Sequence, residues 1–414
     1  MKLNYAKIAI DQPPAIHMDP RRNPFAPGAG TRPPELAGRD EIIERAGVAL
    51  ARVRLGRPAR SQMLLGLRGV GKTVLLSEIA RIAETEGYRA IELEAPENRR
   101  LAEMLVPPLR SVLNRLSTVA KARTVATAAL RGLHSFASVF KVTVGDVELG
   151  LTEPGVADSG NLENDLPELL LLVAQAAQAA DTSVAILIDE VQYLVSEDLA
   201  ALIVSIHRIG QRGLPLILFG AGLPQLAGLA GDAKSYAERL FDYPDVGALE
   251  PDAARRAIRE PIRAEEADIE PAALDAIVAH TEGYPYFVQE WGSHAWDTAP
   301  ASPIAEADVE RATEQALRAL DRGFFRVRFD RLTPKEKEYM RAMAELGPGP
   351  HRSGDVARRL GVSVTEAAPL RAAVIKKGMV YSPRHGETAF TVPMFDTFLK
   401  RSMPDWRPAR RKRR

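Results

Sequence analysis

The sequence predicts an α/β protein whose parallel sheet is covered by helices on both faces, followed by smaller helical domains. A glycine-rich loop joins the short apolar run Gln62–Leu65 to a helical stretch. A second apolar run, Val184–Ile188, is uninterrupted and ends in Asp189 and Glu190. An all-apolar run suits a parallel strand buried on both faces, and the alternation of such runs with helical stretches is typical of a three-layer fold.

The composition is that of an ordinary globular chain. Its 414 residues are 46% hydrophobic and 26% charged, with a net charge of +1 and no cysteine. The absence of cysteine excludes disulfides, a cysteine zinc site and a thiol nucleophile. Met1–Ile10 lacks a signal-peptide core, and Leu169–Ala180 is too short an apolar run to span a bilayer. We therefore expect a soluble, cytoplasmic protein without a membrane partner.

The glycine-rich loop fits the pattern G-x-x-x-x-G-K-[ST], with a strand before it and a helix after it. Its glycines let backbone N–H groups face phosphate oxygens, and the helix adds its positive N-terminal end. We expect Lys72 to neutralise the β- and γ-phosphates and the Thr73 hydroxyl to ligate Mg²⁺. The residues predicted to hold ATP here are Gly66, Leu67, Arg68, Gly69, Val70, Gly71, Lys72, Thr73 and Val74.

Asp189 and Glu190 follow the second apolar run, at the carboxyl end of a predicted strand, where ligands of open α/β sheets bind. We expect Asp189 to hold the metal ion, directly or through water, and Glu190 to polarise an attacking water. Such a pair is a weak signal alone. After a phosphate-binding loop it becomes a strong one.

The pattern changes several times along the chain. Proline-rich residues 1–35 predict an extended, poorly packed arm, and the segment Phe140–Leu151 predicts a β-hairpin that is either an inert ribbon or a partner contact. The predicted parts are the arm at 1–35, the nucleotide-binding core at 36–249 with an insertion at about 101–165, a helical lid at 250–325, a winged helix at 326–403 and a basic tail at 404–414.

The winged-helix prediction rests on the last part of the chain. Helices are predicted at Thr333–Glu345, Ser353–Leu360 and Val364–Lys377, and two short strands flank the turn at Pro383–Gly386. A helix-turn-helix followed by a two-stranded ribbon is the pattern of a winged helix. Six of the last eight residues, Arg407–Arg414, are basic, which favours phosphate backbones or acidic surfaces.

With these motifs, and with the segments Gly38-Arg39-Asp40, Gly220–Pro224 and Gly283-Tyr284-Pro285, the chain resembles an AAA+ ATPase over about residues 36–400. It is most similar to the branch that contains origin-recognition-like initiators and STAND signalling ATPases with a C-terminal winged helix. The resemblance implies a five-stranded sheet with the P-loop strand central and a helical lid over the nucleotide. It also implies that Gly38, Arg39 and Pro285 lie near the bound ATP.

The resemblance further implies an arginine that reaches a γ-phosphate, often from a neighbouring subunit of an oligomer. Arg239 is the candidate for this catalytic role, and a plain surface arginine is the alternative. The third strand ends in Phe219–Gly222, where many AAA+ proteins place a polar residue that positions water. Gln225 is the nearest polar residue, and we do not assign it this role. The lid lacks a Gly-x-x-Arg helix. We therefore expect slow hydrolysis.

Two functions follow from these observations. The first is an ATP-binding and ATP-hydrolysing switch that couples nucleotide state to DNA binding, through Arg371, Lys376 and Lys377 on the third helix of the winged helix, Arg384 and His385 at the wing tip, and the tail. Against DNA, the third helix contains Pro369 and few side chains that read bases. The alternative is therefore a STAND-like signalling or assembly ATPase whose winged helix and hairpin bind protein, with nucleotide setting its oligomeric state.

Overall fold

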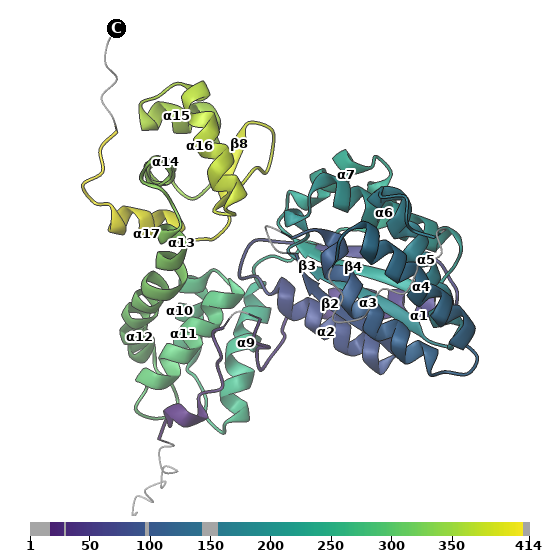
Figure 1. Ribbon diagram of the computed structural model, residues 1–414. Helices are drawn as coiled ribbons and strands as arrows, with labels where there is room; N and C mark the ends of the chain where they lie inside the picture. The colour runs from purple at the N-terminus through teal and green to yellow at the C-terminus, as the bar shows by residue number, and fades with distance from the viewer. Residues whose placement is uncertain (1–16, 29, 96–98, 143–155, 409–414) are drawn as a thin grey trace, which may run out of the picture. The chain divides into compact units, whose positions relative to one another are not determined.

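The computed structural model describes residues 17–28, 30–95, 99–142 and 156–408 (Figure 1). Two compact units are formed. One combines Met1–Gly38 with Ala248–Arg326, and the other combines Arg39–Gly247 with Val327–Arg414. The turn and most of the predicted hairpin at Phe140–Leu151, and the tail from residue 409 onward, lie outside the described residues. No helix in the described segments is both long enough and apolar enough to cross a membrane.

A five-stranded parallel sheet, in the order β2-β3-β4-β1-β5, forms the centre of the second unit. Its strands are β1 (Ser61–Leu65), β2 (Tyr88–Glu94), β3 (Ser183–Asp189), β4 (Leu216–Gly222) and β5 (Phe241–Asp242). The middle strand is β4. The expectation that the P-loop strand is central is therefore wrong in detail, because only the two-residue strand β5 pairs beyond β1.

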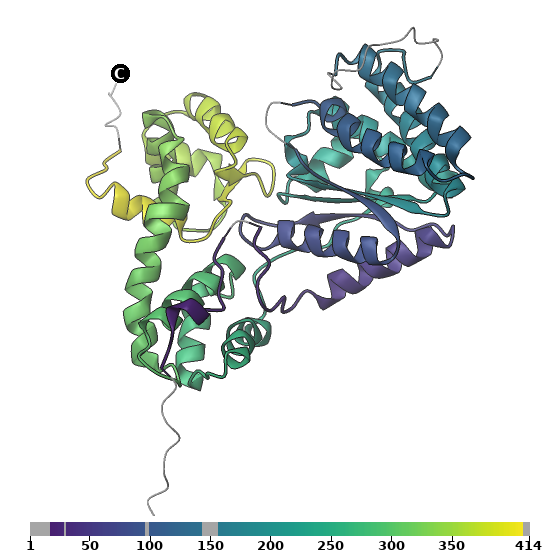
Figure 2. The ribbon, with the colours of Figure 1, turned by 60° about the horizontal axis from the view of Figure 1, so that its bottom comes forward.

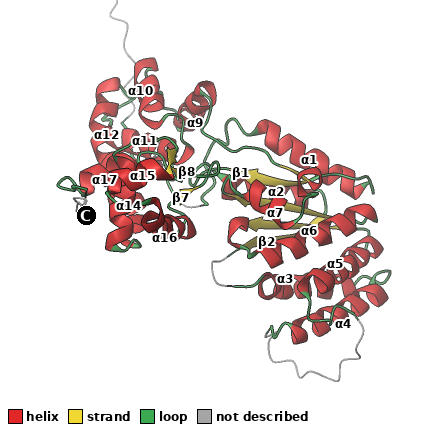
Figure 3. Cartoon of the chain, turned by 90° about the horizontal axis from the view of Figure 1, so that it is seen from above, coloured by secondary structure: helices red, strands yellow, loops and turns green. Residues whose placement is uncertain are grey.

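Helices cover both faces of this sheet, as predicted for a three-layer α/β core (Figures 2 and 3). Helices α1 and α2 lie on one face, and α3, α5, α6 and α7 lie on the other, with α4 packed outside α3 and α5. Their bounds are α1 (Asp40–Arg54), α2 (Lys72–Thr85), α3 (Leu101–Ser117), α4 (Arg123–Val139), α5 (Leu162–Ala179), α6 (Ser196–Gln211) and α7 (Leu226–Ala233). The all-apolar run of β3 is fully buried between the layers, as its composition predicts.

The first unit is built on four helices, α9 (Pro251–Ala264), α10 (Pro271–Thr281), α11 (Pro285–Thr298) and α12 (Glu306–Ala319), the last of which continues into the π-helical turn η3 (Leu320–Phe325). Its core is aromatic. Phe287 and Trp291 of α11 are each 1% exposed, and the Tyr286 ring stacks on Phe324 at a centroid distance of 4.5 Å. Such pairs stabilise a core beyond the area that they bury.

Residues 17–28 of the arm pack against these helices. The expectation of a poorly packed arm is wrong for this part, because Met18 and Phe25 are only 4% and 6% exposed. Gly292 of α11 makes room for the Phe25 ring, since a Cβ atom at this position would lie 2.6 Å from that ring. Burial of these two apolar side chains contributes to anchoring a proline-rich segment that has little other apolar surface.

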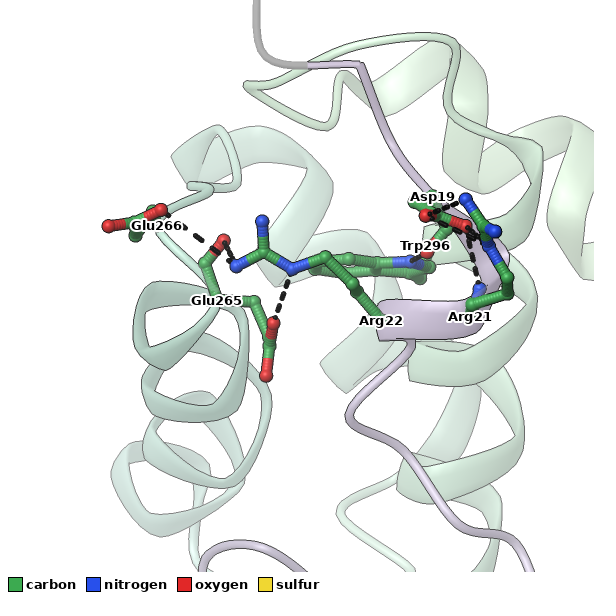
Figure 4. A network of polar contacts seen from close by, with 6 residues as sticks. All are labelled: Asp19, Arg21, Arg22, Glu265, Glu266 and Trp296. Carbon is green, nitrogen blue, oxygen red and sulfur yellow. Dashed lines mark hydrogen bonds and ion pairs between the residues drawn. The ribbon is translucent and has the colours of Figure 1, made fainter.

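Polar contacts fix the same arm segment (Figure 4). The Trp296 Nε1 donates to the Asp19 carbonyl oxygen at 2.9 Å, and Arg22 Nε donates to Glu265 Oε2 at 2.9 Å. The Asn23 amide also donates to Asp297 Oδ1 at 2.9 Å. The Trp296 bond carries most weight, because it satisfies an indole nitrogen in a residue that is only 2% exposed.

The C-terminal part of the chain, described up to residue 408, contains five helices and a small antiparallel sheet in the order β6-β8-β7, and the last helix follows the sheet. Its elements are α13 (Arg326–Asp330), α14 (Pro334–Ala344), β6 (His351–Arg352), α15 (Ser353–Leu360), α16 (Val364–Lys376), β7 (Val380–Tyr381), β8 (Glu387–Phe390) and α17 (Phe395–Ser402). Thr333 and Glu336 form the capping box predicted at the start of α14. The helices predicted at 353–360 and 364–377 are confirmed to within one residue.

Candidate nucleotide site

The glycine-rich loop runs from the end of β1 into the first turn of α2. Gly69 and Gly71 have φ angles of +87° and +93°, in the left-handed region that favours glycine. A Cβ atom at Gly66 would lie 2.2 Å from the carbonyl oxygen of Val246, so no side chain fits there. The loop therefore needs glycine at the positions where the motif has it. Of its backbone N–H groups, that of Gly66 donates to the Gly222 carbonyl oxygen at 3.1 Å and that of Arg68 to the Thr391 carbonyl oxygen at 3.2 Å.

Lys72 is the first residue of α2 and is 6% exposed. Its Nζ donates to the carbonyl oxygens of Gly66 at 3.0 Å and Leu67 at 2.9 Å. Burial lowers the pKa of Lys72, and the nearby carboxylates of Glu190 and Asp189 partly oppose that shift. An anionic phosphate in the loop would stabilise this ammonium group better than neutral carbonyls do.

Thr73 and Asp189 bring two oxygen ligands together from α2 and β3. The Thr73 hydroxyl donates to Asp189 Oδ2 at 2.5 Å, and the N–H of Glu190 donates to Asp189 Oδ1 at 2.7 Å. Burial raises the pKa of Asp189, although both hydrogen bonds lower it. A hydroxyl and a carboxylate oxygen at one point are ligands that Mg²⁺ prefers, with phosphate and water completing its shell. The residues present thus fit the predicted metal ion.

Glu190 directly follows Asp189 in a left-handed conformation, with φ at +54°, and its side chain is 20% exposed. Its Oε1 lies 4.0 Å from Nη1 of Arg68 in the loop. Its Oε2 accepts a hydrogen bond from Nε2 of Gln192, a residue that the sequence analysis missed. Two features of the sequence could have indicated Gln192. It lies two positions after the acidic pair, and the third strand ends in glycine and alanine, without a polar side chain.

Arg39 is 7% exposed and lies beside the loop. Its Nη2 donates to the carbonyl oxygen of Val70 at 3.2 Å and to that of Gly247 at 2.5 Å, and burial lowers its pKa. The side chain thus braces the loop backbone, and its predicted contact with nucleotide stays a prediction. Gly38 and Pro285 belong to the other unit, where Pro285 begins α11, so their approach to nucleotide also stays a prediction.

The remaining predicted residues differ in their surroundings. Val74 is half-buried on α2, and Arg68 donates through Nη2 to the Tyr193 hydroxyl at 2.5 Å. Arg239 lies exposed on the short helix α8 (Ala237–Leu240), and its side chain forms no hydrogen bond or ion pair with the rest of the described chain. An exposed side chain without a partner in the described part of its own chain is compatible with a contact to a second subunit. Its catalytic role stays a prediction.

Residues 35–219 match the family described as the AAA ATPase domain. The match spans the loop, Lys72, Thr73, Asp189 and Glu190. Together with the five-stranded parallel sheet, it supports an AAA+ P-loop ATPase core. Residues 322–399 match a second family, described as a domain of unknown function (DUF8462). A search of curated proteins found no match.

Solved structures with a similar fold include the Walker-type ATPase PABY2304 of Pyrococcus abyssi. That structure is 16% identical, has a TM-score of 0.55 and aligns over 89% of this chain and 97% of its own. The Orc1 protein of Aeropyrum pernix in complex with DNA is 15% identical, with a TM-score of 0.46 over 89% of this chain and 94% of its own. The RuvB Holliday junction branch migration motor of Thermotoga maritima is 16% identical, with a TM-score of 0.45 over 90% and 99%. At these identities the likeness concerns the fold alone, and the last two scores are too low to carry an argument.

Proposed function

We propose that this protein binds ATP with Mg²⁺ and hydrolyses it slowly as a molecular switch. The observation that carries the proposal is the contact between Thr73 and Asp189, 2.5 Å apart at the same sheet edge as Lys72 and Glu190. These groups come from two distant motifs. The fold brings together an ammonium group, a hydroxyl next to a carboxylate, and a second carboxylate, which are the groups that the proposed reaction requires.

Each residue has a distinct part in the proposed reaction. The loop N–H groups and Lys72 bind the β- and γ-phosphates, while Thr73 and Asp189 hold the metal. Bound Mg²⁺ supplies charge neutralisation on the phosphoryl oxygens. The water oxygen attacks the γ-phosphorus while the bond from that phosphorus to the bridging β-phosphate oxygen breaks, which gives ADP and phosphate. Glu190 accepts a hydrogen bond from this water and takes up the proton that it loses. Arg239 of a neighbouring copy is proposed to complete the site.

We propose that the C-terminal domain is a winged helix that carries the output of the switch, with DNA as its first candidate partner. Arg384 and His385 at the turn between β7 and β8 are exposed, as is Lys376 on α16. We propose that these three exposed side chains contact phosphates, together with the basic residues from Arg407 onward. ATP would favour one arrangement of lid and core and thereby shift the population that binds DNA.

A specific observation favours the alternative, a signalling or assembly ATPase whose winged helix binds protein. Arg371 donates to Thr388 Oγ1 at 2.7 Å and to Ser382 Oγ at 2.8 Å, and the Lys377 ammonium contacts Glu336 at 2.6 Å. Two of the three basic residues predicted to face DNA from this helix are therefore engaged inside the domain. Of the seven exposed residues of α16, four are small or apolar, namely Val364, Ala368, Pro369 and Ala372, and only Lys376 is basic.

One titration separates the two outputs. Full-length protein and a version that ends at Met403 are titrated with duplex DNA at two salt concentrations, with ATP and with ADP. The DNA proposal expects binding that weakens with salt, depends on the nucleotide and decreases without the tail. If neither version binds DNA with ATP present, the protein-binding alternative stands. A change of mass with ATP in light scattering would then support it.

A further inference from the structure

We infer that Gln192 is the positioning residue for Glu190 and supplies the polar group that the end of β4 lacks. The inference rests on the proposed ATP hydrolysis and assigns a role in it. Gln192 lies in the 3₁₀ turn η2 (Val191–Tyr193), directly after β3 and Glu190. Neither the phosphate-binding loop nor the acidic pair includes it.

The Gln192 side chain connects two parts of the site. Its Nε2 donates to Glu190 Oε2, and its Oε1 accepts from the N–H of Leu223 at 3.1 Å. Leu223 immediately follows β4, and the strand itself ends in Gly220, Ala221 and Gly222, which carry no polar side chain. One amide thus ties the acidic carboxylate to the strand that lies between β3 and β1.

The end of β4 is shaped for this amide. A Cβ atom at Gly222 would lie 2.6 Å from Gln192 Oε1, so any larger residue would displace it. A Cβ atom at Gly220 would lie 2.3 Å from the Met63 sulfur and 3.2 Å from a methyl group of Val191, the first residue of the turn. The two glycines that remove a polar side chain from β4 therefore make space for the turn that brings Gln192 in.

The backbone at η2 is fixed independently of the amide. Glu190 has φ at +54°, which turns the chain back on itself after β3. The N–H of Tyr193 donates to the Glu190 carbonyl oxygen at 2.9 Å, and Val191 is buried at 1% exposure. The Gln192 side chain thus extends toward Glu190 from a turn that is held by its own backbone hydrogen bond and by the buried Val191. The contact with the amide restricts the rotation of the Glu190 carboxylate.

This arrangement gives the two carboxylate oxygens different tasks. Oε2 is occupied by the amide, and Oε1, 4.0 Å from Arg68 Nη1, faces the glycine-rich loop where the phosphates are proposed to bind. A water held by Oε1 would be directed by a carboxylate whose rotation is restricted. Orientation of this kind raises the rate of the chemical step without strengthening substrate binding.

The test compares Gln192→Ala with Gln225→Ala. Gln225 is the other glutamine near the end of β4, and its side chain forms no hydrogen bond with the described residues. Loss of one orienting hydrogen bond should lower kcat about tenfold in Gln192→Ala while the Kd for ATP stays within about twofold. Gln225→Ala should match the wild type in both. Equal kcat values in the two variants, or a loss of ATP binding that parallels the loss of kcat in Gln192→Ala, would overturn the inference.

A second set of variants separates this inference from the ATPase proposal. Glu190→Gln combined with Gln192→Ala should turn over no more slowly than Glu190→Gln alone, because Gln192 acts only through that carboxylate. If Glu190→Gln lowers kcat and Gln192→Ala does not, the inference is wrong and the ATPase proposal still holds. Wild-type protein that hydrolyses no ATP overturns both.

Discussion

Glu190→Gln is the substitution that best separates binding from chemistry at this site. The change keeps the size of the side chain, and its oxygen can still accept from the Gln192 amide. What it removes is the carboxylate charge and the 4.0 Å contact with Arg68, in a side chain that is 20% exposed. An ion pair of this length at a partly exposed position contributes at most about 1 kcal/mol, so the fold should survive the change.

The effect on turnover should be far larger than the effect on stability. A general base contributes about 10²- to 10⁴-fold, so kcat should fall at least about a hundredfold, which corresponds to about 3 kcal/mol of activation free energy. Phosphate release under saturating MgATP measures kcat, and titration with a fluorescent ATP analogue measures binding. The variant should bind as the wild type does. A loss of affinity as large as the loss of turnover would refute the assignment, because Glu190 would then hold the nucleotide.

Three further predictions concern other parts of the molecule. Phe25→Ala should lower the free energy of unfolding by about 3 kcal/mol, because the ring is buried against Gly292, and thermal unfolding of the full chain measures it. Arg384→Ala should weaken DNA binding and reduce its salt dependence, whereas Arg371→Ala should lower the melting temperature, since Arg371 bonds within its own domain. Asp189→Asn should raise the melting temperature at neutral pH and abolish Mg²⁺-dependent turnover. Burial raises the pKa of Asp189 in the folded state, so the charged carboxylate destabilises the fold above that pKa and protonation relieves this as the pH falls.

The sequence predicted the core of the site because its chemistry is local. One short motif contains Gly66, Gly71, Lys72 and Thr73, so a single stretch of sequence predicts them all. The run Val184–Ile188 that leads to Asp189 is entirely apolar, and such a run fits a strand that is buried on both faces of a sheet. The strand alternation likewise predicted the parallel sheet and its two covering layers. Capping and turn signals in the last part of the chain predicted the helices at 353–360 and 364–377.

The features that were missed depend on contacts between distant segments. Gln192 lies beside the glycines at the end of β4 and accepts a hydrogen bond from the N–H of Leu223. Arg39 was predicted to lie near nucleotide, but its contacts with Val70 in the loop and with Gly247, far along the chain, were not. The arm was judged by its prolines, whereas Phe25 finds a matching space at Gly292 of α11. Periodicity along the chain carries no information about such pairings, so they become visible only when the fold is known.

The most direct test of the nucleotide site is an ATP titration by calorimetry, with Mg²⁺, on the wild type and on Lys72→Ala. Lys72 is 6% exposed and is held by the Gly66 and Leu67 carbonyls inside the loop. The wild type should bind one ATP per chain, and the variant should lose at least about a hundredfold in affinity, because it leaves the phosphates without their buried cation. Wild-type affinity in Lys72→Ala, or no ATP binding by the wild type, would contradict the account.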